Sequence, residues 1–419
     1  MAVNVNKIIS LEEAQRLVLA ATKPVATEKV PLENASGRVL AEEIRAFRNE
    51  PPIPRAAMDG YAVHSADVVS ASEGKSVLLS VVGVVGPGQH SDAELKRGEA
   101  LQIMTGGSMP AGADAVVPQE MTERVSEGIW VMAPVAAKDH FISVGAELHQ
   151  DEHLISSDTV LGVKELTILA TQGHTAVKVR RQPVVAVLAT GSELVEVGEG
   201  LGRGEVFASN LHTVTTLVNR CGGIARPLGI AGDDLNKLTS GIQHGSNADV
   251  VVTTGGTGKG EKDLVSEAVS TLDGDMVFRG VAMSPGKQTL FAKLNETLLF
   301  GLPGRPPATF IAFEQLVRPV LLRMLGLSPV FLPEITGVLR QPVKVKGKTI
   351  SFLFSLLVFG ADGPEVKSLR SETKGILTEM LSANSLLKVG PEKGRLEKGE
   401  RVQVQVLDVG LEGLSYFPK

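Results

Sequence analysis

The sequence contains a single cysteine, Cys221, among its 419 residues. One cysteine excludes an intramolecular disulfide framework and any zinc or iron–sulfur site built on several cysteines. Aromatic residues make up only 4 % of the chain, which argues against a stacking surface for single-stranded nucleic acid. The 42 Lys and Arg residues are outnumbered by 47 Asp and Glu residues. The basic excess typical of a nucleic-acid-binding protein is therefore missing.

Long apolar runs are also missing. None approaches the roughly 18 residues that a membrane-spanning helix needs, because the longest runs, at 77–85 and 350–360, have the length of strands. The first nine residues contain no apolar segment of the kind found in a secretory signal. We therefore expect a cytoplasmic protein that has no membrane and no nucleic-acid partner.

The N-terminal third contains three kinds of segment in succession: predicted helices, a proline-rich connector and a β-rich module. Ser10 and Glu13 form a capping box, which predicts a helix to about residue 21, and a second short helix is expected at 39–44. Three prolines between residues 51 and 54 then predict a stiff, extended connector. From about 60 to 142, short apolar runs alternate with Gly, Pro and Asp turns, which predicts a compact β-rich module.

A different pattern begins near residue 183. Apolar runs at 184–188, 249–253 and 297–300 alternate with helical segments at 212–220, 234–244 and 306–325. Strands that alternate with helices predict a parallel α/β sheet. After Pro329 short strands return, at 343–345, 350–359, 385–389 and 401–406, so we expect a small C-terminal β module.

Three glycine-rich loops follow strands of the α/β region, at 190–193, 254–263 and 301–305. Glycine allows backbone N–H groups to turn toward a phosphate, and Lys259, Lys262 and Arg305 add positive charge. Ligands of open α/β sheets bind at the carboxyl ends of the strands, so these loops predict an anion site. The alternative is that each loop is an ordinary strand-to-helix turn with solvated lysines.

Familiar nucleotide and zinc motifs do not fit. The loop at 254–263 lacks the first glycine and the Ser or Thr of a P-loop, and it lacks the third glycine of GxGxxG. His149 to His153 matches the H-x-x-E-H pattern, which requires a helix, but the residues that follow predict a strand and a turn. A polar loop is therefore the interpretation of that segment.

Two further segments carry polar side chains in turns. Asp59 follows the proline connector, and Thr105 is expected at the end of a strand, where its hydroxyl can reach an oxyanion. Taken singly, each also fits a structural role, since Asp and Thr often satisfy turn backbone.

Taken together, these segments resemble the molybdopterin molybdenumtransferases, a family related to the catalytic end of gephyrin. The matching segments, in order, are 57–62, 104–117, 187–195, 209–210, 229–235, 253–264, 285–287 and 301–306. The Met-Asp-Gly-Tyr-Ala and Gly-Leu-Pro-Gly sequences are the most specific of them, and the resemblance extends from about residue 7 to residue 408.

The resemblance implies an elongated multidomain chain of class α/β plus β modules. Its parts are an N-terminal segment at 1–46 and 143–180, an inserted β-rich module at 47–142, a central α/β molybdopterin-binding domain with a parallel-type sheet at 181–328, and a C-terminal β module at 329–419. It also implies a homodimer, with each active site between the α/β domain of one subunit and the N-terminal part of the other.

The implied reaction inserts molybdate into adenylylated molybdopterin with release of AMP, assisted by Mg²⁺. Both small molecules are substrates, and contact with other proteins of molybdenum cofactor biosynthesis is implied as well. Carried over position by position, the catalytic residues are Asp59, Thr105, Glu193, Asp263 and Lys287. Metal binding is implied for Asp59, Glu147 and Glu193. The substrate-binding residues are Ser209, Asn210, Asp233 or Asp234, Gly255, Gly256, Thr257, Gly258, Pro285, Gly286, Pro303, Gly304 and Arg305.

The chain departs from the family pattern at five places. The altered positions are Ala56 with its neighbour Arg55, Glu147, Ser192, Ser284 and Arg305. Ser284 loses a cation and Arg305 adds one. Because the changes cluster at the implied site, an alternative hypothesis is a divergent, non-catalytic paralogue that binds or carries molybdopterin or scaffolds a partner. The sequence leaves the choice between molybdate and tungstate open.

Overall fold

A computed structural model describes residues 8–92, 94–258, 263–345, 347–370 and 375–407. The chain divides into two compact units. The larger unit comprises Met1–Glu42, Ser157–Ala170 and His174–Lys419, and the smaller unit comprises Glu43–Ser156 and Thr171–Gly173. The four-part division expected from the sequence is finer than these two units and stays a prediction.

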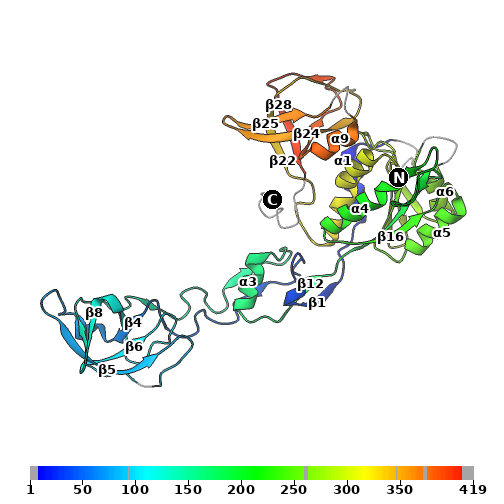
Figure 1. Ribbon diagram of the computed structural model, residues 1–419. Helices are drawn as coiled ribbons and strands as arrows, with labels where there is room; N and C mark the ends of the chain where they lie inside the picture. The colour runs from blue at the N-terminus through cyan, green and yellow to red at the C-terminus, as the bar shows by residue number, and fades with distance from the viewer. Residues whose placement is uncertain (1–7, 93, 259–262, 346, 371–374, 408–419) are drawn as a thin grey trace. The chain divides into compact units, whose positions relative to one another are not determined.

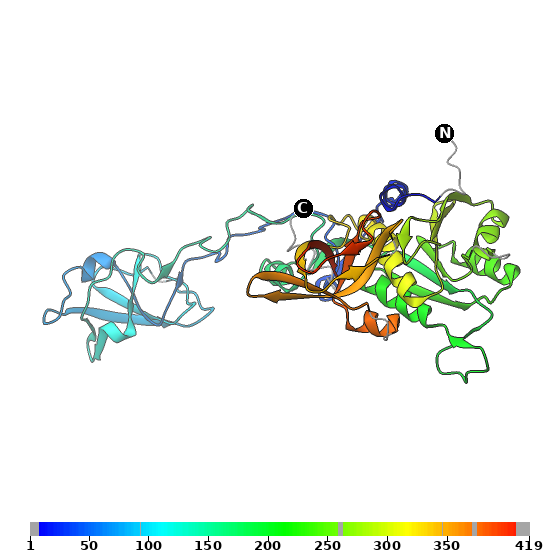
Figure 2. The same cartoon turned by 90° about the horizontal axis from the view of Figure 1, so that it is seen from above.

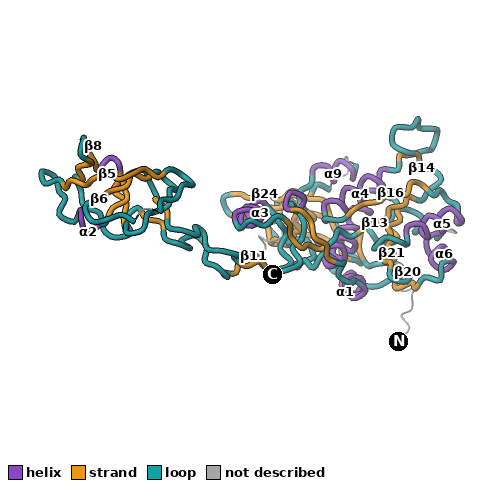
Figure 3. Tube along the Cα trace, turned by 90° about the horizontal axis from the view of Figure 1, so that it is seen from below, coloured by secondary structure: helices purple, strands orange, loops and turns teal. Residues whose placement is uncertain are grey.

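The smaller unit is rich in strands, as the sequence predicts, and contains the short helix α2 (Figure 3). Its main sheet has the order β7-β4-β6-β5-β9-β8, and β2–β11 and β3–β10 form two-stranded pairs. The elements are β2 (Ile44–Arg45), β3 (Arg55–Ala56), β4 (Gly60–Val63), α2 (Ser65–Val68), β5 (Val77–Val85), β6 (Glu99–Ile103), β7 (Ala115–Pro118), a 3₁₀ turn (Gln119–Met121), β8 (Thr122–Val125), β9 (Gly128–Val131), β10 (Phe141–Ile142) and β11 (His153–Ile155).

Gly60 lets β4 run close beside β7. A Cβ atom at this position would lie 2.0 Å from the carbonyl oxygen of Val117, a distance that no side chain tolerates. All four residues of β4 are buried, so the strand that begins directly after Asp59 is fixed in the core of the module.

In the larger unit, the N-terminal residues form a helix and a two-stranded sheet. Helix α1 (Leu11–Ala21) begins where the capping box predicts, with the Ser10 side chain accepting a hydrogen bond from the Glu13 N–H at 3.1 Å. Strand β1 (Thr27–Pro31) pairs antiparallel with β12 (Ala176–Arg180). A 3₁₀ turn (Leu32–Asn34) and helix α3 (Val163–Thr171) complete this part of the chain.

The helix expected at 39–44 is wrong. The Leu40 N–H donates to Thr159 O, the Ala41 N–H donates to Lys178 O, and Val39 forms an isolated bridge with Val160. Backbone groups that pair with residues more than a hundred positions away leave no i to i−4 bonds for a helix. A segment of six residues is too short for local propensity to prevail.

The α/β domain is built on a sheet of order β16-β13-β17-β21-β20-β18, in which the first four strands are parallel and the last two antiparallel to their neighbours. Its elements are β13 (Val184–Ala189), β14 (Leu194–Val195), β15 (Val206–Phe207), α4 (Ser209–Arg220), β16 (Ile224–Ile230), α5 (Leu235–Gly245), β17 (Val250–Thr254), α6 (Leu264–Thr271), β18 (Asp275–Arg279), β19 (Met283–Ser284), β20 (Leu290–Leu294), β21 (Thr297–Leu302), α7 (Pro306–Ala312), the π-helix η3 (Phe313–Val317) and α8 (Arg318–Met324).

Helices cover both faces of this sheet (Figure 1). Helices α5 and α6 pack side by side on one face, over Ala186 and Val251. Helix α4 and the segment from α7 to α8 pack on the other, over Val187 and Val252. Every residue of β17 and β21 is buried, which is the pattern of central strands covered on both sides. The predicted α/β domain is confirmed.

The C-terminal residues form a second sheet, of order β19-β24-β25-β22-β28-β26, and an additional β24–β26 pairing closes it. Strand β19 of the α/β domain pairs with β24. The elements are β22 (Glu334–Leu339), β23 (Val343–Lys344), β24 (Ile350–Gly360), β25 (Gly363–Ser368), α9 (Ile376–Ser382), β26 (Ser385–Val389), β27 (Arg395–Leu396) and β28 (Arg401–Val406). The predicted C-terminal β module is confirmed. Among the described residues, no helix has both the length and the apolar character needed to cross a membrane.

Candidate active site

A cavity of about 610 Å³ opens where β13, β17 and β21 end. The loops that follow these strands, and the start of α4, form its wall. Ten of the residues singled out from the sequence line it: Glu193, Ser209, Asn210, Asp233, Gly255, Gly256, Thr257, Gly258, Gly304 and Arg305. The structure therefore brings together the three glycine-rich loops at one edge of the sheet, as the strand-end rule predicts.

The loop after β17 turns sharply against Thr190, the residue that follows β13. Gly255 and Gly256 have φ angles of +86° and +65°. A Cβ atom on Gly255 would lie 2.2 Å from the carbonyl oxygen of Thr190, and one on Gly256 would lie 3.0 Å from its Cγ2. Both conformation and space therefore require glycine here. The Thr190 side chain is buried, and its hydroxyl has no hydrogen-bond partner within the described residues.

The turn after β21 is held by hydrogen bonds from two buried side chains. The Asn210 amide donates to the carbonyl oxygen of Gly304 at 2.7 Å. The Thr309 hydroxyl donates to the carbonyl oxygen of Pro303 at 2.5 Å and lies 3.2 Å from that of Arg305. The Pro303 and Gly304 backbone is thus fixed, while the Arg305 side chain is exposed at the cavity.

Two acidic residues lie at the cavity in different surroundings. The Glu193 carboxylate folds back over its own turn, since a Cβ on Gly191 would lie 2.6 Å from its Oε2. Asp233 accepts a hydrogen bond from the Ser192 hydroxyl and another from the Ser192 N–H at 3.3 Å. Asp234 instead caps α5, accepting from the N–H groups of residues 236 and 237 at 2.9 and 3.1 Å. Of the two alternatives at 233 and 234, Asp233 is the one that lines the cavity.

The Asp263 carboxylate makes hydrogen bonds and an ion pair within the α/β domain. Its carboxylate caps α6, accepting from the Ser266 N–H at 3.1 Å and the Ser266 hydroxyl at 2.8 Å, and it forms an ion pair with Arg279. The side chain is only 8 % exposed and does not line the 610 Å³ cavity. These contacts account for the residue structurally, and its catalytic role stays a prediction. Lys259 and Lys262 lie outside the described residues.

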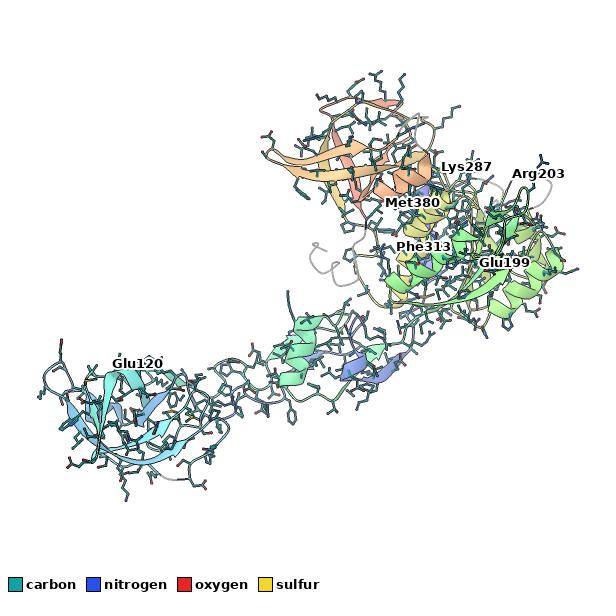
Figure 4. All side chains as sticks on the ribbon, in the orientation of Figure 1. Glu120, Glu199, Arg203, Lys287, Phe313 and Met380 are labelled. Carbon is teal, nitrogen blue, oxygen red and sulfur yellow. The ribbon has the colours of Figure 1, made fainter. Side chains whose placement is uncertain are left out.

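Lys287 is exposed and belongs to a separate turn of the α/β domain (Figure 4). Gly286 precedes it with φ +113°, and a Cβ there would lie 2.6 Å from the Met283 Cε. Pro285 borders a second cavity of about 350 Å³, which is lined mainly by residues of the C-terminal module, including Arg370. Of the segment 285–287, none lines the larger cavity; the neighbouring Gln288 does.

The smaller unit holds Asp59 and Thr105 together. The Thr105 N–H and hydroxyl both donate to the Asp59 Oδ1, at 2.7 and 2.8 Å. These two donors, the backbone N–H first, hold the pKa of Asp59 below its ordinary value, against a slight opposing effect of burial. Both residues are exposed. The pair is therefore an ionised carboxylate in a fixed orientation on the surface of its module.

Within each unit, the described side chains do not form a cluster of candidate metal ligands. Glu147 is exposed, and its backbone N–H bonds the Glu50 carbonyl at 2.9 Å. The segment from His149 to His153 forms a turn followed by the first residue of β11, so the interpretation as a polar loop is confirmed. In the described ranges, no three His, Cys, Asp or Glu side chains gather as a metal site requires.

Some cavity residues were not singled out from the sequence. Thr190 belongs to the loop at 190–193 that the sequence predicts for an anion site, but no role of its own was predicted for it. Phe207 and Leu377 give no such signal, since both line the cavity from segments without a recognisable motif. Phe207 belongs to β15, at the base of the loop that projects from the α/β domain in Figure 2, and Leu377 belongs to α9.

Comparison with known proteins identifies the chain. Family models match three successive stretches: the MoeA N-terminal region (domain I and II) at residues 9–173, a probable molybdopterin binding domain at 186–323, and the MoeA C-terminal region (domain IV) at 336–407. A molybdopterin molybdenumtransferase of Bacillus subtilis (strain 168) is 34 % identical over 318 residues, which cover 75 % of this chain and 74 % of the relative. One from Staphylococcus aureus (strain COL) is 30 % identical over 408 residues, covering 96 % and 97 %.

This chain belongs to the molybdopterin molybdenumtransferase family. A crystal structure of a molybdopterin biosynthesis moeA protein from Pyrococcus horikosii superposes with a TM-score of 0.84 at 32 % identity, covering 96 % of this chain and 99 % of that one. The resemblance seen in the sequence is confirmed, and so is the combination of a central α/β domain with β modules.

The positions at which this molybdenumtransferase family member departs from the pattern have different surroundings. Ser192 bonds Asp233 and Arg305 lines the larger cavity. Ser284 borders the smaller cavity. Ala56 is buried and Glu147 is exposed. Two of the five changes therefore lie at or against the wall of the larger cavity.

Proposed function

We propose that this chain inserts molybdate into adenylylated molybdopterin and releases AMP. The observation that carries the proposal is the cavity at the carboxyl ends of β13, β17 and β21, whose glycine turns and Arg305 suit a ligand with phosphates. Its volume of about 610 Å³ lies in the range of small-molecule sites.

The residues at the cavity suit different parts of such a substrate. The backbone N–H of Gly256, for which no acceptor is found among the described residues, and the exposed guanidinium of Arg305 complement phosphate oxygens. Phe207 and Leu377 offer apolar surface to a planar ring. Lys287 does not line this cavity; we assign the oxyanion to it because its ammonium group is exposed and can pair with an anion.

Asp59 contributes an ionised carboxylate to the same proposal, since its two hydrogen bonds from Thr105 keep it charged and oriented. Mg²⁺, when bound, would neutralise phosphate charge during cleavage of the phosphoanhydride. In the described residues no three His, Cys, Asp or Glu side chains gather to hold it, and Asp59, Glu147 and Glu193 stay the residues proposed to bind it.

The test is release of AMP from adenylylated molybdopterin by the purified protein, with molybdate and Mg²⁺ present. We expect release to depend on molybdate, and tungstate in its place measures oxyanion choice. If adenylylated molybdopterin binds but AMP is not released above background, the activity is absent and the non-catalytic paralogue is the better account.

The homodimer and the cytoplasmic location implied by the resemblance belong to this proposal too. Sedimentation velocity is expected to give twice the mass of one chain. A monomer at the concentrations of the activity assay would contradict the dimer without affecting the assignment of the cavity.

A further inference from the structure

Asn210 is a nearly buried polar residue in the wall of the larger cavity. It is the second residue of α4 and is only 8 % exposed. Its amide nitrogen donates to the Gly304 carbonyl oxygen at 2.7 Å. Its Oδ1 is buried, and no partner for it is found in the described part of the chain. The side chain thus directs its hydrogen bond to the turn after β21.

That hydrogen bond acts on the peptide that links Gly304 to Arg305. Because a peptide unit is planar and trans, holding the Gly304 carbonyl also fixes the direction of the Arg305 N–H. No acceptor for that N–H is found among the described residues. The exposed Arg305 guanidinium likewise has no ion pair or hydrogen bond among them.

The turn also contacts the loop that follows β17. A Cβ on Gly304 would lie 3.5 Å from the Gly255 Cα, and the Gly255 N–H donates to the Leu302 carbonyl oxygen at 3.0 Å. Thr309, fully buried in α7, donates its hydroxyl to the Pro303 carbonyl oxygen. Two side chains, Asn210 and Thr309, therefore hold the only cationic residue found on the cavity wall in the described ranges.

We propose that Asn210 is a positioning residue, which acts through the Gly304 carbonyl to present the N–H and guanidinium of Arg305 to a phosphate of the ligand. This rests on the proposed function, because it takes the ligand to carry phosphates. A flexible arginine loses conformational freedom when it binds, and a fixed backbone lowers that cost.

A double-mutant cycle separates this role from direct contact or from general stability. Binding of inorganic pyrophosphate is measured by calorimetry for the wild-type protein, Asn210→Ala, Arg305→Ala and the double variant. We expect Arg305→Ala to weaken binding about tenfold and Asn210→Ala about fivefold. The double variant should be about twentyfold weaker than the wild type, because Arg305→Ala keeps the backbone N–H of residue 305, and this is less than the roughly fiftyfold loss that independent effects would give. Thr309→Val is expected to repeat the pattern of Asn210→Ala.

Thr297→Val is the matched control. Thr297 also donates its hydroxyl to backbone carbonyls, those of Ser246 and Ala248 at 2.7 and 3.0 Å, but at the opposite end of β21. It should lower the melting temperature and leave pyrophosphate affinity unchanged.

Multiplying effects in the double variant, an unchanged affinity in Asn210→Ala, or a wild-type protein that does not bind pyrophosphate would each overturn the inference. A protein that shows the expected coupling and yet releases no AMP would defeat the proposed function alone.

Discussion

Two regions of this molecule carry predicted site residues and are built in opposite ways. The turn at Gly255 is packed against Thr190 so closely that a single added carbon has no space. Asp59 and Thr105, in the smaller unit, are exposed and are joined by two hydrogen bonds that Thr105 donates to the Asp59 carboxylate. A substitution at Gly255 is therefore expected to change both the shape of the cavity and the stability of the fold. A change of charge at Asp59 is expected to have little effect on folding.

Gly255→Ala is expected to have the largest effect. The new Cβ would lie 2.2 Å from the Thr190 carbonyl, at a φ of +86°, so the loop must move. We expect the free energy of unfolding to fall by about 3 kcal/mol and AMP release to fall at least about 100-fold. Urea unfolding and the AMP assay measure the two effects.

Gly399→Ala is the control for backbone strain alone, since Gly399 has φ +87° and no neighbouring atom lies within 4 Å of the position that its new Cβ would take. It should cost about 1 kcal/mol and leave AMP release unchanged. Equal losses of stability in the two variants would show that close packing at Thr190 is not what requires Gly255.

Asp59→Asn is expected to act on turnover and not on folding. The amide keeps the Oδ1 acceptor for both Thr105 donors and removes only the charge. We expect turnover to fall about 100-fold, with little change in melting temperature. Glu120→Gln removes an exposed charge from the same unit (Figure 4) and should change neither. A lower melting temperature with normal turnover would instead mark Asp59 as structural.

Lys287→Ala should weaken binding of the oxyanion selectively. Loss of a charge-assisted contact is expected to cost about 2 kcal/mol, or roughly a thirtyfold higher KM for molybdate. Lys293→Ala removes another cation of the same unit, one paired with Asp275 at 3.8 Å, and should leave this KM unchanged. Identical molybdate dependence in all three proteins would remove Lys287 from the site.

Thr105→Val gives the smallest effect. It removes the hydroxyl donor and keeps the backbone N–H, the larger cause of the lowered pKa of Asp59, so the pKa should rise only part of the way to its ordinary value. Because the pKa is lowered in the folded state, the stability that Asp59 contributes is present above its ordinary pKa and lost as pH falls through the lower one. NMR titration of the carboxyl carbon measures the shift, and an unchanged pKa would contradict the role of the hydroxyl.

Much of the architecture could be predicted because local signals were strong. The capping box at Ser10 places the start of α1, and continuous apolar runs place β13, β17 and β21. The long helix expected at 306–325 is present, but with a π-helix at Phe313–Val317, which no sequence pattern indicated. The helix expected at 39–44 was wrong because the backbone of that segment pairs with residues 159–178, a choice made by partners distant in the sequence.

The same contrast between local signals and distant contacts applies to the candidate site. The strand-end rule located the glycine loops. The helix predicted from residue 234 fits Asp234 at the cap of α5, but no local signal places Asp233 at the cavity. Likewise, Asp263 follows a glycine-rich loop and would suit a catalytic carboxylate, yet Arg279, sixteen residues later, pairs with it.

The sequence by itself determined the order of helices and strands, the glycine turns at the strand ends and the family to which the chain belongs, because these depend on residue type and spacing. Only the tertiary structure decided which polar groups meet: Asn210 with Gly304, Thr190 with Gly255, Asp59 with Thr105. Each of these contacts joins segments more than forty residues apart in the sequence. Packing of the core brings such segments together, and the local preferences of the chain do not.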